Sequence, residues 1–159
     1  MRKFFFCLGI FAAILIATAV IGIGYAFLTG SGHDEEAKQY ADNSVIAVTS
    51  HWDADELRSR ASQELLKKVK QEDLVSMFTW FASLGPLVDY QGSKQHAWNV
   101  SVWTGKGKVI SADFLAYAKY TNGPAEIKLN IVNTDGVWKI NGFRVNSSAL
   151  IENKVGRNM

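Results

Sequence analysis

The feature that most constrains this chain is a run of 25 residues, Phe4 to Leu28, without a charged side chain. As a helix the run is ~37 Å long, at about 1.5 Å per residue. That length exceeds the roughly 30 Å hydrocarbon core of a bilayer, so the run can span a membrane with some tilt. The sequence therefore predicts a membrane anchor over residues 1–28, and the residues after it must supply the folded core.

A signal peptide that is later removed is the alternative interpretation of this segment. Such peptides have a hydrophobic region of about 7–15 residues followed by a small-residue cleavage site. Ala17-Thr18-Ala19 offers that pattern, but Val20 to Leu28 continue the apolar run beyond it. We expect an uncleaved anchor, and under either interpretation the rest of the chain acts outside the cytoplasm.

Charges on the two sides of the run predict its orientation. Arg2 and Lys3 precede it, whereas the first charges after it are acidic, at residues 34–36. Because Lys and Arg next to a membrane span are retained on the cytoplasmic side, we expect a cytoplasmic N-terminus. The prediction is a single-pass protein of a bacterial inner membrane, held through residues 4–28, with a periplasmic C-terminal domain. Cys7, the only cysteine, lies within the run, so no intrachain disulfide can form.

Composition argues against several classes of partner. The chain has 17 Lys and Arg against 15 Asp and Glu, and two of the basic residues precede the anchor, so the exported part is formally neutral. No basic cluster is interleaved with aromatic residues, so we expect no nucleic-acid binding. His33, His51 and His96 are scattered without the spacing of a metal site, and we expect no metal and no cofactor.

Periodicity divides the rest of the chain into a linker, a domain and a tail. Residues 29–33 predict a flexible linker, 34–148 one domain, and 149–159 a tail. Apolar residues then recur at helical spacing in three segments. We predict helices that begin near Asp34, near Asp53 or Asp55, and near Glu72, the last ending at Gly85-Pro86. The second should continue to Val69, with Leu57, Ala61 and Leu65 on one face.

The second half of the chain changes to strand periodicity. Apolar residues alternate with polar ones, and Asn122-Gly123-Pro124 and Thr134-Asp135-Gly136 mark turns. We predict four consecutive antiparallel strands near residues 96–104, 108–121, 125–134 and 136–147. In the last strand Trp138 and Ile140 have one parity and Phe143 and Val145 the other. A β-bulge at Asn141-Gly142 would keep all four on one face and bend the sheet.

This order of elements, with the ending Gly136-Val137-Trp138-Lys139-Ile140-Asn141-Gly142-Phe143, resembles the nuclear transport factor 2-like, or cystatin-like, superfamily. The resemblance covers about residues 34–148. It implies an α+β cone of three helices on a curved four-stranded antiparallel sheet, with a concave pocket and frequent dimerisation through the sheet. The superfamily contains isomerases and dehydratases, and also membrane-anchored non-catalytic domains of assembly complexes.

Two Asp and Tyr pairs are the candidates for chemistry in such a pocket. Asp113 and Tyr117 share one parity of a predicted strand, and Asp89 and Tyr90 lie where the helices lead into the sheet. A carboxylate held in an apolar cavity beside a Tyr hydroxyl is suited to acid–base work. Trp80, on the apolar third helix, completes the candidate lining. The pairs match no catalytic motif of the superfamily, so we assign no catalytic residue.

The sequence thus predicts a membrane-anchored binding or assembly module, a homo-oligomer or a partner of another envelope protein. Its third helix is apolar on more than one face, which predicts that it lies across the sheet and under the other helices. Alternatively, Met77 and Trp80 contact a partner or the membrane surface. The competing functions are a pocket enzyme of the isomerase or dehydratase type and a carrier of apolar ligands. The enzyme requires Asp113 or Asp89 to project into a closed cavity.

Overall fold

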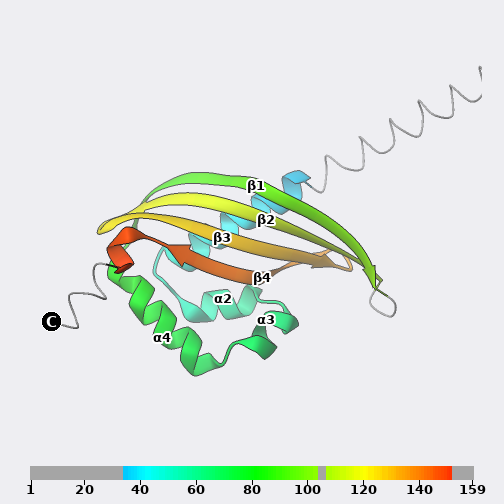
Figure 1. Cartoon of the computed structure of the whole chain (residues 1–159), viewed down its shortest axis with the longest axis horizontal. Helices are drawn as coiled ribbons and strands as arrows, with labels where there is room; N and C mark the ends of the chain where they lie inside the picture. Colours follow the sequence, from blue (N-terminus) through cyan, green and yellow to red (C-terminus); the bar gives the residue numbers. More distant parts are fainter. Residues whose placement is uncertain (1–33, 104–106, 152–159) are drawn as a thin grey trace, which may run out of the picture. The chain divides into compact units, whose positions relative to one another are not determined.

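The computed structural model describes residues 34–103 and 107–151. They form an α+β domain in which helices pack on one side of a four-stranded antiparallel open sheet. The strands β1 (Leu87–Trp103), β2 (Gly107–Tyr120), β3 (Gly123–Thr134) and β4 (Val137–Asn146) lie in this order in the sheet, so each pairs with its neighbour in sequence. Figure 1 shows the sheet curving over the helices, which occupy its concave side. The predicted anchor and linker lie outside the described residues.

The first described helix covers residues 34–49 and crosses the inner face of the sheet. Its fully buried positions repeat at the spacings of three and four that predicted it: Ala37, Ala41, Ser44, Val45, Val48 and Thr49. The helix ends before Trp52, whose backbone adopts a positive φ of 52°. The Trp52 indole donates a hydrogen bond of 2.8 Å to the Gly85 carbonyl, and its ring packs on Tyr120 and Phe81.

The predicted second helix is two short helices, α2 (Ala54–Arg60) and α3 (Gln63–Lys68). The chain breaks between them because Ala61 forms a parallel bridge with Ile140, and the Ser62 amide donates to the Ile140 carbonyl at 2.7 Å. Ser62 then caps α3, its hydroxyl accepting from the Leu65 amide. The prediction of one continuous helix was wrong, because these contacts with β4 displace the helical hydrogen bonds at the break.

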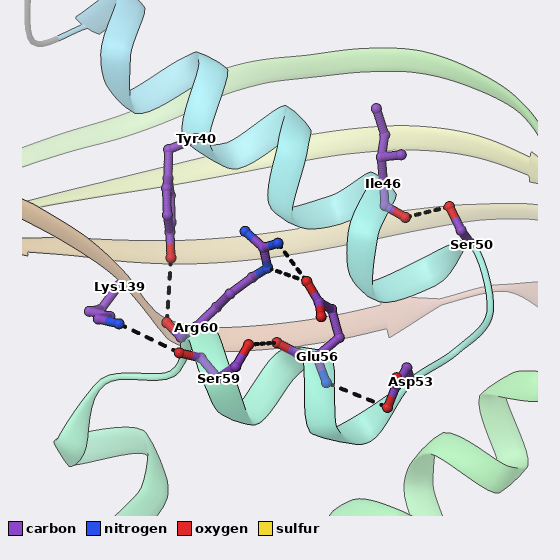
Figure 2. Close-up of polar contacts among 8 residues, drawn as sticks. All are labelled: Tyr40, Ile46, Ser50, Asp53, Glu56, Ser59, Arg60 and Lys139. Carbon is purple, nitrogen blue, oxygen red and sulfur yellow. Dashed lines mark hydrogen bonds and ion pairs between the residues drawn. The ribbon is translucent and has the colours of Figure 1, made fainter.

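Side chains from other elements hold α2 in place. In Figure 2 the Tyr40 hydroxyl donates to the Arg60 carbonyl at 3.4 Å, and Lys139 of β4 reaches the Ser59 carbonyl at 3.5 Å. Within α2, the Arg60 guanidinium binds the Glu56 carboxylate one turn earlier. The helix is therefore tied both to residues 34–49 and to the edge of the sheet.

The third predicted helix is α4 (Gln71–Phe81), extended by the 3-10 turn η1 (Ala82–Leu84). It buries Leu74, Phe78 and Phe81 on one face only. The expectation that it lies under other helices was wrong, because its remaining apolar side chains face outward. Gly85 ends η1 with a φ of +78°, in the left-handed region that favours glycine.

The four predicted strands are present, and only β1 differs clearly from its predicted extent. Strand β1 begins nine residues earlier than predicted. Register shifts at three places interrupt the alternation of apolar and polar residues, so this part of the strand could not be recognised from its sequence. The predicted bulge of β4 is present: Asn130 pairs with Gly142 and Ile131 with Ile140, which leaves Asn141 as the inserted residue. A short helix at residues 148–151 follows, and its Leu150 is buried in the core.

Candidate functional site

An apolar groove lies among the short helices. It has a volume of about 400 Å³, within the ~300–1,000 Å³ typical of ligand sites. Helix α3 buries no side chain completely; Leu65 is half-buried and Leu66 is 39% exposed. Three of the ten lining residues are charged, namely Arg58, Lys70 and Glu72. The groove is lined by Leu57, Arg58, Ala61, Leu65, Leu66, Val69, Lys70, Gln71, Glu72 and Leu74.

Helix α4 carries further exposed apolar side chains that do not line this groove. Val75 is 49% exposed, Met77 40% and Trp80 38%, although the Trp80 ring packs partly on Phe81, with ring centroids 5.5 Å apart. Trp80, predicted to line a pocket, is thus a surface residue on the helical side of the domain. Leu66 and these three residues together are called the helical patch below.

The second hollow lies at one end of the outer face of the sheet, which the helices leave uncovered. The alternation of β2 sends Ala116, Ala118 and Tyr120 into the core, whereas Tyr117 and Lys119 are exposed on the other side. The hollow is open and has a volume of about 440 Å³. Seven of the ten residues that line it have polar side chains: the lining consists of Gln91, Tyr117, Ala118, Lys119, Pro124, Ala125, Glu126, Asn146, Ser147 and Ser148.

A bulge in β1 is fixed from the inside by Asp42, which the sequence analysis missed. Tyr90 pairs with Ala118 and Ser93 with Ala116, so two residues, Gln91 and Gly92, stand opposite Tyr117 alone. The Asp42 carboxylate accepts hydrogen bonds from the Tyr90 hydroxyl at 2.6 Å and the Ser93 amide at 2.9 Å. Both residues that flank the bulge therefore bind one side chain of the 34–49 helix.

Electrostatics at this clamp favour the ionised carboxylate. Burial by itself raises the pKa of Asp42, but hydrogen bonds from Lys38, Ser93 and Tyr90 outweigh it, and the net pKa is lowered. Burial and the hydrogen bond to Asp42 together raise the pKa of Tyr90, so this phenol keeps its proton. The predicted candidate Tyr90 is thus a structural donor.

Asp113 ends a chain of hydrogen bonds that crosses from the helices to the outer face. The Ser62 hydroxyl donates to Asn141, the Asn141 amide to Asn130, and the Asn130 amide to Asp113, over 2.9, 2.9 and 2.7 Å. The inserted residue of the β4 bulge is therefore the middle link. Asp113 itself is exposed, so it does not meet the requirement for a carboxylate in a closed cavity.

The structure does not bring the five predicted pocket residues together. Asp113 and Tyr117 do share the outer face of β2, but they are four residues apart, which is about 13 Å along a strand. Asp89 is exposed on β1, where it pairs with Lys119. Of the two hollows described here, Tyr117 lines the one on the outer face, and the other four residues line neither.

Comparisons with known proteins add no assignment: no family model matches the chain, and no curated protein matches it. Among residues 34–103 and 107–151, no three or more His, Cys, Asp or Glu are grouped so as to hold a metal ion. In the same part of the chain, no helix has the length and apolar character needed to cross a membrane.

Proposed function

We propose that this protein is a single-pass, membrane-anchored module that binds a protein partner of the bacterial envelope outside the cytoplasm. The observation that carries the proposal is the helical patch. Leu66, Val75, Met77 and Trp80 are each between 38% and 49% exposed on α3 and α4, beside the apolar groove. Met77 and Trp80, three residues apart, lie on one flank of α4, and exposed Met and Trp side chains are enriched at protein interaction sites.

The sequence supports the cellular setting of this proposal. The uncharged run at residues 4–28 and the basic pair before it favour an anchor with a cytoplasmic N-terminus. The short segment at residues 29–33 would keep the domain close to the membrane. The resemblance to the nuclear transport factor 2-like superfamily, which includes anchored assembly domains, is compatible with this role and with self-association.

Crosslinking in native membranes tests the partner. The full-length chain and a Leu66→Glu, Met77→Ala double variant are crosslinked, and the recovered proteins are identified by mass spectrometry. The double variant introduces a charge at Leu66 and shortens Met77. It should lower the crosslinked yield of each specific partner at least tenfold, because apolar contacts near the centre of an interface contribute most of its affinity. Val137→Ala, at a site 56% exposed on β4, is the control and should keep them.

Two results would contradict the proposal. One is a set of recovered partners that is unchanged in the double variant although circular dichroism shows it folded. The other is recovery of no protein, this chain included, from wild-type membranes under conditions that crosslink a known envelope complex.

A carrier of apolar ligands is the second candidate, and the groove favours it. Leu57, Leu65 and Val69 give the groove an apolar lining of the kind that encloses small ligands. Organic extraction of the purified full-length protein distinguishes the two functions. A stoichiometric lipid-like compound, lost on Leu65→Gln, would support the carrier, whereas an empty extract with retained protein crosslinks supports the binding module.

A further inference from the structure

The outer-face hollow is organised by the register of the sheet. Tyr117 pairs with Glu126, and Glu126 pairs with Asn146, so their side chains stand in one row across β2, β3 and β4. The β1 bulge places Gln91 and Gly92 opposite the same Tyr117. All four strands thus contribute to one row, which spans about 14 Å at roughly 4.8 Å per strand.

The row combines one aromatic ring with planar polar groups. Tyr117 is 40% exposed, and within residues 34–103 and 107–151 its hydroxyl makes no hydrogen bond. The same holds there for the side-chain amides of Gln91 and Asn146. The Glu126 carboxylate lies 3.6 Å from Lys128. Two amides, a phenol and a carboxylate therefore provide both donors and acceptors towards the hollow.

We propose that this hollow binds a neutral oligosaccharide, with one sugar ring stacked on Tyr117. The C–H face of a pyranose is apolar enough to pack on an aromatic ring, while its outward hydroxyls pair with amide and carboxylate groups. Gln91 and Asn146 lie on opposite sides of Tyr117 and Glu126 in the row, so they are placed to bind hydroxyls at both ends of the ligand.

The shape and charge of the hollow favour this ligand over other classes. An apolar ligand needs an enclosed site, whereas this hollow is open, and the amides, phenol and carboxylate of its lining would gain no partner from such a ligand. Lys119 and Glu126 are the charged residues of the lining and offset one another, so a strongly anionic ligand gains little there. A row longer than one sugar ring suits a chain that lies across the strands.

The β1 bulge is what places Gln91 opposite Tyr117. In an uninterrupted strand, one residue rather than two would stand opposite Tyr117. Gly92 permits the bulge with a φ of +85°, and Asp42 binds both flanking residues from the core side. Asp42 is therefore a positioning residue for the site and does not itself touch the ligand.

Saturation-transfer NMR on the full-length protein in detergent micelles tests the site. The probes are cellotetraose, chitotetraose and maltotetraose, each titrated separately. We expect transfer to ring C–H protons of at least one probe. Tyr117→Ala should lower the affinity about tenfold through lost stacking, and Tyr117→Phe should keep most of it. Trp80→Ala, which removes an exposed aromatic ring from the helical side, should leave binding unchanged.

Gln91→Ala and Asn146→Ala are the second pair of variants, and each should weaken the same probe. They keep the proposal testable if Tyr117→Ala fails to fold. Absence of transfer from all three probes to the wild type overturns the proposal, as does binding that is equal in wild type and in these variants. The helical-patch double variant should still bind sugar, so failure here is distinguishable from failure of the proposed protein partner.

Discussion

At the scale of single residues, Asp42 has the widest consequences of any polar side chain described above. It receives hydrogen bonds from Lys38 on its own helix and from Tyr90 and Ser93 on β1. Its position between Ala41 and Asn43 gave no signal in the sequence, because a polar residue beside a helical apolar stripe is usually solvated. Its partners follow about fifty residues later and become visible only in the fold.

Asp42→Ala should lower the free energy of unfolding by about 1–3 kcal/mol at neutral pH, because it leaves the Tyr90 hydroxyl and the Ser93 amide without their acceptor. Urea unfolding of the full-length protein measures the difference. Asn43→Ala, the exposed neighbour on the same helix, is the control and should change stability far less. Equal losses in the two variants would contradict the assigned role of the clamp.

The same carboxylate predicts a pH dependence. The pKa of Asp42 is lower in the folded protein than in the unfolded chain, where it is about 3.9. Its stabilising contribution is therefore complete above that unfolded value and is lost as the pH falls through the folded pKa. The stability difference between wild type and Asp42→Ala should stay constant from pH 6 to 8 and shrink below about pH 4. A difference that grew in acid would contradict this assignment.

Gly85 and Gly136 allow a test of how backbone strain and crowding together limit an added side chain. Both have a positive φ, +78° and +82°, and Gly85 combines it with a ψ of −174° that only glycine adopts readily, so alanine should cost about 1–2 kcal/mol at Gly136 and more at Gly85. A Cβ at Gly85 would lie 3.0 Å from the Thr121 Cβ, whereas a Cβ at Gly136 has nothing within 4 Å. Gly85→Ala should therefore lower the thermal unfolding midpoint more than Gly136→Ala. Equal shifts would contradict both the added backbone strain and the crowding at Gly85.

At the scale of elements, periodicity predicted the helices, turns and strands whose signals lie within a few residues. The differences between predicted and observed elements come from contacts between residues distant in sequence. The 34–49 helix, the β2–β3 and β3–β4 turns and the β4 bulge follow from spacing, Gly and Asp-Gly signals within a few residues. The break at Ser62 depends on Ile140, and the early start of β1 depends on a bulge held by Asp42. No local pattern contains those partners. For the same reason the candidate pairs of Asp and Tyr did not converge.

Ser62→Ala should destabilise α3 by about 0.5–2 kcal/mol, because the Ser62 hydroxyl caps this helix and also donates to Asn141. Hydrogen exchange provides the local readout: the Leu65 amide should exchange faster in the variant. Ser76→Ala is the matched control, since the Ser76 hydroxyl donates only to a carbonyl within α4. Unchanged exchange at Leu65 would show that the cap contributes little.

At the scale of the whole molecule, the domain has two unlike surfaces. The helical side presents an apolar patch and groove, and the outer face of the sheet presents polar residues around Tyr117. The edges of the sheet are less available, because β1 is interrupted by register shifts and residues 61–62 pair with β4. Interrupted and covered edges resist strand addition, so binding is expected on the faces.

Membrane topology is tested by labelling introduced cysteines in a Cys7→Ser background. Val88→Cys, at a site 62% exposed on β1, should react with a membrane-impermeant maleimide while the inner membrane is intact, if the domain is periplasmic. Arg2→Cys should react only after that membrane is opened. The reverse pattern would contradict the predicted orientation, and absence of the protein from the membrane fraction would contradict an uncleaved anchor.

The separation in sequence between contacting residues also determines when each contact can form during synthesis. Asp42 binds Ser93, 51 residues later, and Ser62 binds Asn141, 79 residues later. At roughly 5–20 residues per second of synthesis, Ser62 waits about 4–16 s for its partner. During that time the sheet that covers the apolar side of the 34–49 helix is incomplete. We therefore expect chaperones to bind the apolar side of this helix in a newly synthesised chain until the last strand has been made.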